Sequence, residues 1–311
     1  MFNVGTHTSI AGGIEKAFER SAAVGGTTLQ IFAKSPRGRA IPTYTDEQYE
    51  AWRWYRKQFN QIGGLVHSNY LVNLSKPAVE LQREIASVLH DFEVAHKLGY
   101  EAVNVHIGKL KGFPTRDEAM KNMVQNVEAI LKEVKNNGYD DVQFLFENTA
   151  GQGSEIGSTL EELSYFRTNY LHDLPVKFCL DTAHCRGGGI DLHKRGQFVT
   201  EFAEQVGLEQ LYSIHLNDAK VPLWAHLDRH ASLGYGFIGW PVLVPIIQWA
   251  ATNDRHLYIE TPKDELRSQE IDRVRQIAEG DVEWVQAVHE ANYCSDSLKK
   301  FIDHAEQERL F

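Results

Sequence analysis

The sequence is poor in cysteine, in proline and in long apolar runs, and each shortage excludes a class of protein. Its three cysteines, Cys179, Cys185 and Cys294, form no CxxC pair, so we expect neither a disulfide framework nor a thiolate zinc site. No segment approaches the roughly 20 apolar residues of a membrane span, and the N-terminus lacks a signal-peptide pattern. We therefore expect a globular, cytoplasmic protein with no membrane partner.

Positive charge is also in short supply, because 32 basic residues stand against 42 acidic ones and give a net charge of −10. Such a field repels phosphate and, taken alone, disfavours nucleic acid. Two features weaken this exclusion. Carboxylates of a metal site count in the total while bound cations do not, and basic residues occur together in three predicted loops: Lys34, Arg37 and Arg39, then Lys109 and Lys111, then Lys194 and Arg195.

Eight short apolar or β-branched runs are present, and each is followed by a stretch with helical periodicity. This βα alternation is typical of a parallel sheet, and the mostly continuous hydrophobicity of the runs fits strands buried on both faces. Eight units in about 260 residues favour one α/β domain, a (β/α)₈ TIM barrel, over two doubly wound domains. The runs are VGTHTS (4–9), TLQIF (28–32), GLVH (64–67), AVNVH (102–106), VQFLFE (142–147), VKFCLD (176–181), YSIHLN (212–217) and LYIET (257–261).

Boundaries of helices and domains can also be predicted. In residues 77–100, Pro77 stands where a helix start tolerates proline and Gly99 where a helix end favours glycine. We expect the barrel to occupy residues 1–285. Residues 286–311 should form a C-terminal extension of one or two amphipathic helices packed on the outside, and the protein should be a monomer.

Imidazole and carboxylate side chains recur at the carboxyl ends of the predicted strands, the end where TIM barrels carry their active sites. A lone histidine there is usually a hydrogen-bonded core or rim residue, and a lone acid is usually a helix cap. Core packing and helix capping do not readily explain why such residues recur at the ends of strands three to eight, since only 14 of 311 residues are histidine. The residues are His7, His67, His106, Glu147, Asp181 with His184, His215 and Glu260, followed by Asp228 and His230 in the loop after strand seven.

This donor set indicates a metal centre. Imidazole nitrogens and carboxylate oxygens without thiolate select zinc, manganese or iron, and so many histidines disfavour magnesium. About nine such groups exceed what one ion uses, which suggests two or three ions that share a carboxylate. Clustered ions stabilise both the attacking and the leaving oxygen of a phosphoryl displacement, so phosphodiester hydrolysis is the predicted reaction class.

Eight motifs, in order, resemble those of one known family. They read GTHTSIAGG, QIFAKSPR, HSNYLVNL, FENTAGQG, LDTAH, HLNDAK, LDRHASLG and IETP. Over about residues 3 to 285 the chain resembles endonuclease IV, the zinc-dependent apurinic/apyrimidinic endonucleases of base-excision repair. The resemblance implies hydrolysis of the phosphodiester on the 5′ side of an abasic site in double-stranded DNA, leaving a 3′-hydroxyl and a 5′-deoxyribose phosphate.

The resemblance also implies roles for individual residues, among them three Zn²⁺ ions per chain. His67, His106 and Glu147 would bind the first zinc, Glu147 with Asp181, His215 and Glu260 the second, and His184, Asp228 and His230 the third. Glu147 and Glu260 would be catalytic. Arg37, Tyr70 and Leu71 would enter the duplex, although the residues alone favour rim packing for Tyr70 and Leu71. Asp218 and His226 fall outside the ligand set and would be rim or second-shell residues.

Four loops depart from the family pattern without removing a ligand. They are HIGKLKG after strand four, AHCRGGGIDL after strand six, where three glycines follow Arg186, SLGYG, where Tyr235 replaces an acid, and the loop that carries Arg37, which Ser35-Pro36 alters. We expect these departures to act on DNA contacts.

Three other functions remain as alternatives. A one-metal, xylose-isomerase-like sugar isomerase or epimerase would use Glu147, Asp181, His215 and Glu260 and leave the other donors without a task. A UV-damage endonuclease of the same superfamily would keep DNA as substrate. A DNA-binding scaffold without catalysis is disfavoured because all nine predicted ligands are present.

Overall fold

The computed structural model describes residues 2–77, 81–110, 112–113, 115–193 and 197–293. In that part of the chain, no helix combines the length and the hydrophobicity that crossing a membrane would require.

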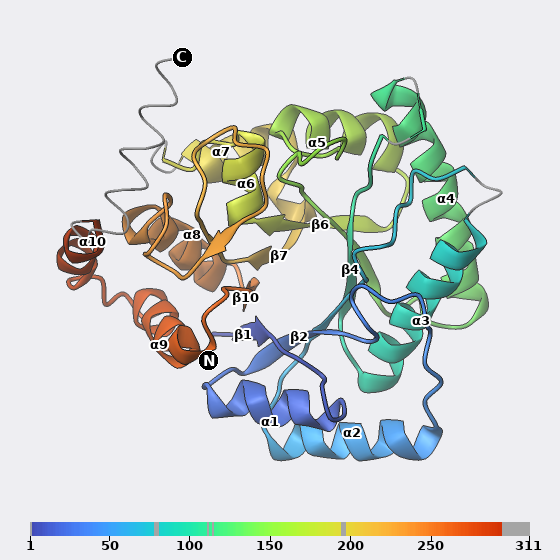
Figure 1. The fold of residues 1–311 in the computed structure, drawn as a ribbon, viewed down its shortest axis with the longest axis horizontal. Coiled ribbons are helices and arrows are strands. Elements are labelled where there is room, and N and C mark those ends of the chain that lie inside the picture. The colour runs from blue at the N-terminus through green and yellow to red at the C-terminus, as the bar shows by residue number, and fades with distance from the viewer. Residues whose placement is uncertain (1, 78–80, 111, 114, 194–196, 294–311) are drawn as a thin grey trace.

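Eight parallel strands close into a barrel in the order β1-β10-β7-β6-β5-β4-β3-β2 (Figure 1). The strands are β1 (Val4–His7), β2 (Thr28–Phe32), β3 (Leu65–His67), β4 (Ala102–His106), β5 (Gln143–Glu147), β6 (Val176–Asp181), β7 (Leu211–His215) and β10 (His256–Ile259). Every strand expected from the sequence is present, with ends that differ by no more than two residues, so the predicted TIM barrel is confirmed. An additional two-stranded ladder, β8 (Asp218–Ala219) with β9 (His230–Ala231), was not predicted and lies in the loop after β7.

Helices surround the barrel and cover its outer face (Figure 1). They are α1 (Glu15–Ala23), α2 (Asp46–Gln58), α3 (Gln82–Leu98), α4 (Arg116–Asn136), α5 (Leu160–Phe166), the π-helix η2 (Arg167–Leu171), α6 (Thr182–Gly188), α7 (Gln197–Gln205), the short η3 (Leu208–Gln210), α8 (Trp240–Thr252), the short η4 (Asp264–Leu266), α9 (Arg267–Ala278) and α10 (Val285–Tyr293). The apolar layer between strands and helices forms the main core, with large buried side chains such as Phe18, Phe92, Phe144 and Phe178.

The start of α3 differs from the prediction, while its end agrees with it. Gly99 ends the helix with φ 69° and ψ 36°, the left-handed conformation that glycine adopts without strain. The helix begins at Gln82, not at Pro77. The side chains of Asn122 and Asn126 on α4 donate to the carbonyl groups of residues 74–76, and these bonds fix the segment before Pro77 as a loop.

An extra helix follows the eighth β/α unit, as expected. Helix α10 lies beside α8, where the Trp284 and Trp240 rings pack edge to face with centroids 5.3 Å apart. Because α10 begins at Val285, it starts at the predicted domain boundary. The rest of the predicted extension, residues 294–311, lies outside the described residues, so the boundary and the full extension stay predictions.

The barrel interior has two layers that differ in polarity. Its amino-terminal half is filled by Leu65, Ala102, Leu145, Cys179 and Tyr258, all fully buried. Two residues further along four of these strands stand His67, Asn104, Glu147 and Asp181. Since alternate residues of a strand face the same side, the same strands present an apolar floor and, above it, a polar mouth.

Candidate metal centre

The nine predicted ligands meet at the mouth of the barrel. Three groups hold donor atoms within 4.8 Å of one another: His67, His106 and Glu147; Glu147, Asp181, His215 and Glu260; and Asp181, His184 and His230. Asp228 joins the last group, with its Oδ2 3.4 Å from His184 Nε2 and its Oδ1 3.1 Å from His230 Nε2. Residues 163 positions apart in the chain, His67 and His230, thus belong to one continuous cluster of donors.

Strand register explains why these side chains meet. His106 pairs with Glu147 across β4 and β5, and Asp181 pairs with His215 across β6 and β7. Paired residues of neighbouring parallel strands lie at the same height in the sheet, so their side chains fall in one layer of the barrel.

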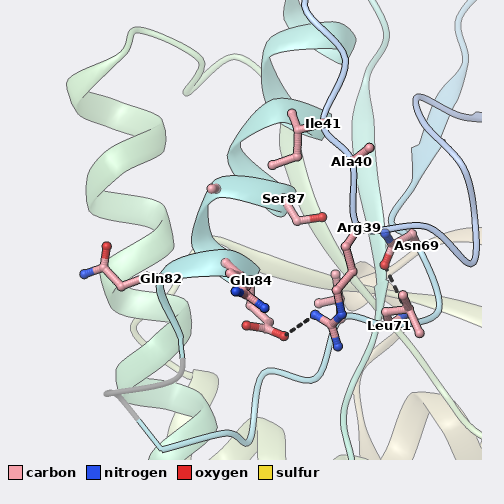
Figure 2. A pocket seen from close by; sticks show the side chains of 11 residues that line it. Arg39, Ala40, Ile41, Asn69, Leu71, Gln82, Glu84 and Ser87 are labelled. Atoms are coloured by element: carbon pink, nitrogen blue, oxygen red, sulfur yellow. Dashed lines mark hydrogen bonds and ion pairs between the residues drawn. The ribbon is translucent and has the colours of Figure 1, made fainter.

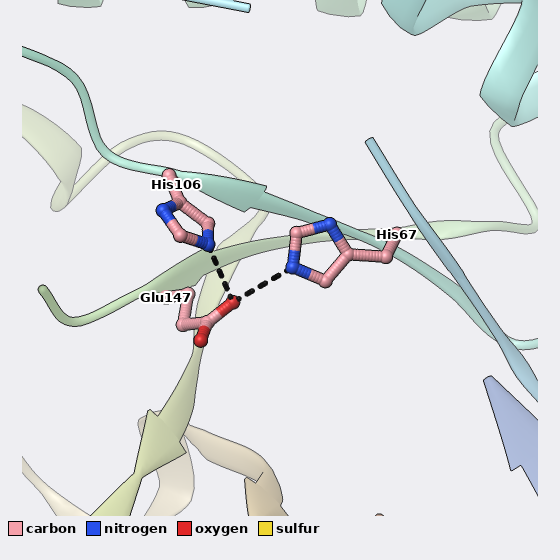
Figure 3. Close-up of side chains that lie close together, drawn as sticks. All are labelled: His67, His106 and Glu147. Carbon is pink, nitrogen blue, oxygen red and sulfur yellow. Dashed lines mark hydrogen bonds and ion pairs between the residues drawn. The ribbon is translucent and has the colours of Figure 1, made fainter. Parts of the chain in front are cut away.

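Glu147 lies between the first two groups. Its Oε2 atom is 3.1 Å from His67 Nε2 and 3.4 Å from His106 Nε2 (Figure 3). Its other oxygen, Oε1, is 3.1 Å from His215 Nδ1. One carboxyl oxygen therefore faces each group, which is the arrangement that a bridging carboxylate requires.

Histidine neighbours favour the ionised form of two carboxylates of the cluster, Glu147 and Asp228. Burial would raise the pKa of Glu147, but the neighbouring His215 and His106 hold this pKa well below its usual value. Burial acts on Asp228 in the same way, and His184 and His230 nevertheless lower its pKa. A hydrogen bond from Asn104 Nδ2 to Glu147 Oε2, at 2.6 Å, favours the charged form of Glu147 further.

The imidazoles near Asp228 respond in the opposite direction, whereas burial lowers the pKa of His106. Burial would lower the pKa of His184, but Asp181 and Asp228 raise it well above its usual value. The same two carboxylates raise the pKa of His230 to about 9 against the effect of burial. The cluster therefore attracts positive charge strongly.

The donor set and its charge fit divalent cations. Among the described residues, Glu147, Asp181, Asp228 and Glu260 form ion pairs with histidines and with no lysine or arginine. Buried carboxylates are otherwise paired or bound to metal. Nitrogen and oxygen donors without thiolate suit zinc, manganese or iron.

Two amides that support the ligands were missed in the sequence. Gln30 Oε1 accepts from His215 Nε2 at 2.8 Å, and Gln30 Nε2 donates to Glu260 Oε1 at 2.7 Å. Asn217 Nδ2 donates to Asp181 Oδ2 at 2.7 Å. The available signal was a polar residue inside an apolar strand, as in TLQIF, because such a residue must face a polar interior.

His7, which ends β1, contacts the cluster without belonging to any of its three groups. Its Nδ1 lies 2.9 Å from Glu260 Oε1, and its Nε2 is buried with no hydrogen-bond partner among the described residues. His7 therefore supports Glu260, as a metal ligand's hydrogen-bonding partner commonly does.

The predicted DNA-contacting residues lie on one side of the mouth. The backbone N–H of Tyr70 donates to Pro36 O at 3.0 Å, and Asn69 Nδ2 donates to Gly38 O at 2.8 Å. These bonds tie the loops after β2 and β3 together, which brings exposed Arg37 next to Tyr70 and Leu71. Tyr70 is 50% exposed, and its ring centroid lies 5.9 Å from those of His67 and His106.

A hollow of about 560 Å³ opens beside these loops (Figure 2). Leu71, Ile41 and Ser87 line it, and Arg39 reaches toward Glu84, with Nη1 3.8 Å from Oε1. Leu71 thus borders this hollow. The residues alone favoured rim packing for Leu71, but such packing does not enclose its side chain.

Two expectations about polar residues are wrong. Lys34 is not available to a ligand, because it is buried and forms an ion pair with Asp91, a residue 57 positions away. Asp218 is not on the rim but fully buried, and its carboxylate accepts backbone N–H groups of Ala219 and of residues 234, 236, 238 and 239. It shapes the loop that follows β9. Lys111, Lys194 and Arg195 lie outside the described residues.

Comparison with known proteins agrees with this geometry. The family model described as xylose isomerase-like TIM barrel matches residues 18–288. The chain is 34% identical to a protein of Haloarcula marismortui named probable endonuclease 4, over 89% of this chain and 99% of that one. A protein of the same name from Aquifex aeolicus is 32% identical, over 84% of this chain and 92% of that one.

Solved structures give the same result. The crystal structure of endonuclease IV from Thermus thermophilus superposes with a TM-score of 0.78 at 32% identity, over 89% of this chain and 99% of that one. A D-tagatose 3-epimerase-like protein has a TM-score of 0.68 at 16% identity, over 89% and 99% of the two chains, which shows a shared fold alone. The chain belongs to the endonuclease IV family of xylose isomerase-like TIM barrels.

Proposed function

We propose that this chain is a DNA-repair endonuclease that hydrolyses the phosphodiester on the 5′ side of abasic sites in duplex DNA, with three zinc ions bound at the mouth. Its family makes it an endonuclease, a hydrolase of DNA. The observation that carries the rest of the proposal is the position of Glu147, which directs one oxygen to each of two donor groups.

The ligand sets follow from the three donor groups. His67, His106 and Glu147 would hold one zinc, and Asp181, His215 and Glu260 would share Glu147 around a second. His184, Asp228 and His230 would hold the third. When bound, clustered zinc ions polarise a phosphate and lower the pKa of water toward neutrality.

Glu260 would be oriented by Gln30 and His7, two residues outside the ligand sets. Burial would raise its pKa, but His215 and a hydrogen bond from His7 lower it far below its usual value. Its Oε1 is fixed by Gln30 and His7, which leaves Oε2, 3.3 Å from His215, to face the cluster. The carboxylate of Glu260 would therefore enter the reaction ionised, with Oε2 directed to the cluster.

The rim residues would select the damaged nucleotide. Arg37, Tyr70 and Leu71 stand together beside the first donor group and are suited to enter the duplex. An abasic nucleotide leaves the helix at little cost, because it has no base to unstack. Selection of the damaged site would thus rest on the low free-energy cost of turning an abasic nucleotide out of the duplex.

Sugar isomerisation is less well supported. A single divalent ion would need Glu147, Asp181, His215 and Glu260, which form one donor group. His67, His106, His184, Asp228 and His230 would then have no task, although all of them converge on the same mouth.

A nicking assay tests the proposal. A duplex that contains a tetrahydrofuran abasic analogue should be cut on the 5′ side of the analogue, and a chelator should abolish the cut. The analogue cannot undergo β-elimination, so cutting it separates a hydrolase from a lyase. Glu260→Gln should lose nicking and keep its fold by circular dichroism. Full activity of Glu260→Gln would refute the assignment of the site.

The rim assignment needs its own test. The double variant Tyr70→Ala, Leu71→Ala should bind zinc as the unaltered protein does and lose its preference for the abasic duplex over an intact one. A preference retained in full would remove these two residues from damage selection.

A further inference from the structure

Trp224 is an exposed aromatic residue held in an unfavourable backbone conformation. Its φ is 67°, and that of nearby His226 is 51°, in the left-handed region that bulky residues rarely adopt. The Trp224 side chain is 55% exposed, so its burial does not repay this strain. Strained residues of this kind persist where the surrounding structure fixes them and are concentrated at functional sites.

The loop that carries Trp224 is fixed by the carboxyl end of α6. The backbone N–H of Trp224 donates to Arg186 O at 3.1 Å, and that of His226 donates to Gly187 O at 3.0 Å. One side of the indole lies directly against Gly189, where an added Cβ would approach the ring to 2.2 Å. The three consecutive glycines seen in the sequence therefore allow this loop to lie close to α6.

The two preceding glycines of α6 are also closely packed, one against Ser158 and the other against the loop that carries Trp224. An added Cβ at Gly188 would approach Ser158 O to 2.3 Å, and one at Gly187 would approach Leu227 O to 2.9 Å. Asp228 is anchored nearby, since its N–H donates to Gln152 Oε1 at 3.3 Å. The loop is thus held on both sides, and the exposed part of the Trp224 ring remains available.

The position of Trp224 complements that of Tyr70. Trp224 lies four residues before Asp228, in the loop between β8 and β9 that follows β7. In the closed barrel β7 stands opposite β3, which precedes Tyr70. The loops that carry these two exposed aromatic residues therefore leave the barrel on opposite sides of its mouth.

We infer that Trp224 is a stacking platform for the nucleobase that an abasic site leaves without a pairing partner, on the side of the cluster opposite Arg37, Tyr70 and Leu71. The inference rests on the proposed function. An indole face accepts any base, because every base has a π-face, so the contact contributes affinity that does not depend on sequence. Trp224 touches no reacting atom in this role and is a positioning residue that holds the duplex across the mouth.

Two substitutions separate the ring from the backbone. Trp224→Asn removes the ring but keeps a residue that tolerates a left-handed conformation, and Trp224→Phe keeps a ring. For Trp224→Asn we expect Kd for duplex DNA and KM for nicking to rise about tenfold with kcat unchanged. Trp224→Phe should recover most of the affinity. Trp54→Gln, which alters a Trp with the same exposure, 56%, on the outer helix α2, should change neither constant.

Indole fluorescence supplies a second readout that a merely structural role would not move. Stacking on a base should quench part of the emission when duplex is added, and this part should be missing in Trp224→Phe. An unchanged Kd for Trp224→Asn, or a fall in kcat with KM unchanged, would overturn the inference. Nicking by the unaltered protein reports separately on the proposed function, since the binding comparison can be repeated with abasic duplex in the Glu260→Gln background, which should not cut it.

Discussion

The floor and the mouth of the barrel are built from the same strands, yet their chemistry is opposite. Leu145 on β5 lies in an apolar layer, and Glu147, two residues later on the same face, contacts four histidines. Cys179 and Asp181 repeat the contrast on β6. Two residues along one strand therefore separate the layer that stabilises the fold from the layer that carries the candidate metal ligands.

Loss of a carboxylate charge in the mouth should have the largest effect on activity. For Glu147→Gln we expect activity on abasic duplex to fall more than about a hundredfold, the upper range for a residue that only supports a metal ligand. The thermal midpoint of the metal-free protein should change little, because the floor is untouched. A variant that unfolds at a much lower temperature would show that the two layers are not separable.

Loss of packing in the floor is the matched experiment on the same strand. Leu145→Ala leaves a cavity in a fully buried layer and should destabilise the protein by about 2–5 kcal/mol in denaturant unfolding. Its kcat at a temperature well below the unfolding midpoint should remain close to that of the unaltered protein. A large loss of kcat would show that the floor helps to shape the site.

The amides between the layers should have intermediate effects. Gln30→Met keeps the volume but removes the bonds to His215 and Glu260, so we expect activity or zinc affinity to fall about 10- to 100-fold. Gln143→Met, at the amino end of β5, is the control and should leave both unchanged. Equal losses in the two variants would deny Gln30 its supporting role.

The smallest effect concerns pH in the metal-free protein. The folded state raises the pKa of His230 to about 9 through Asp181 and Asp228, so this histidine binds a proton more tightly when folded than when unfolded. Its contribution to stability is present below an unfolded pKa of about 6.5 and is lost as pH rises to about 9. Chelated protein should therefore unfold more easily at pH 9 than at pH 6.5. His230→Gln should reduce that difference, and an unchanged difference would assign it to other groups.

Local sequence patterns sufficed for the strands and for the positions of the nine donors. Seven donors end a barrel strand or follow one within three residues, and a closed parallel barrel brings all such ends to one face. The other two, Asp228 and His230, lie in the loop after β7. Patterns failed where a partner is distant in sequence. Lys34 was expected to be available to a ligand. Its neighbours in sequence do not indicate that it is neutralised, because its partner Asp91 lies 57 residues away on α3.

Sequence patterns also failed to predict the roles of residues that act through the backbone. Asp218 was expected on the rim or beside a ligand, but its carboxylate accepts N–H groups from the loop that ends at Gly239. The left-handed conformation of Trp224 could not be expected from its residue type, because glycine and asparagine usually occupy that region. Only the three-dimensional arrangement relates it to the glycines of α6.

The metal content of the purified protein tests the central claim most directly. Elemental analysis should find close to three zinc ions per chain, with one lost when His184 and His230 are both replaced by alanine. A single ion per chain in the unaltered protein would contradict the shared role of Glu147 and favour one-metal chemistry at this mouth.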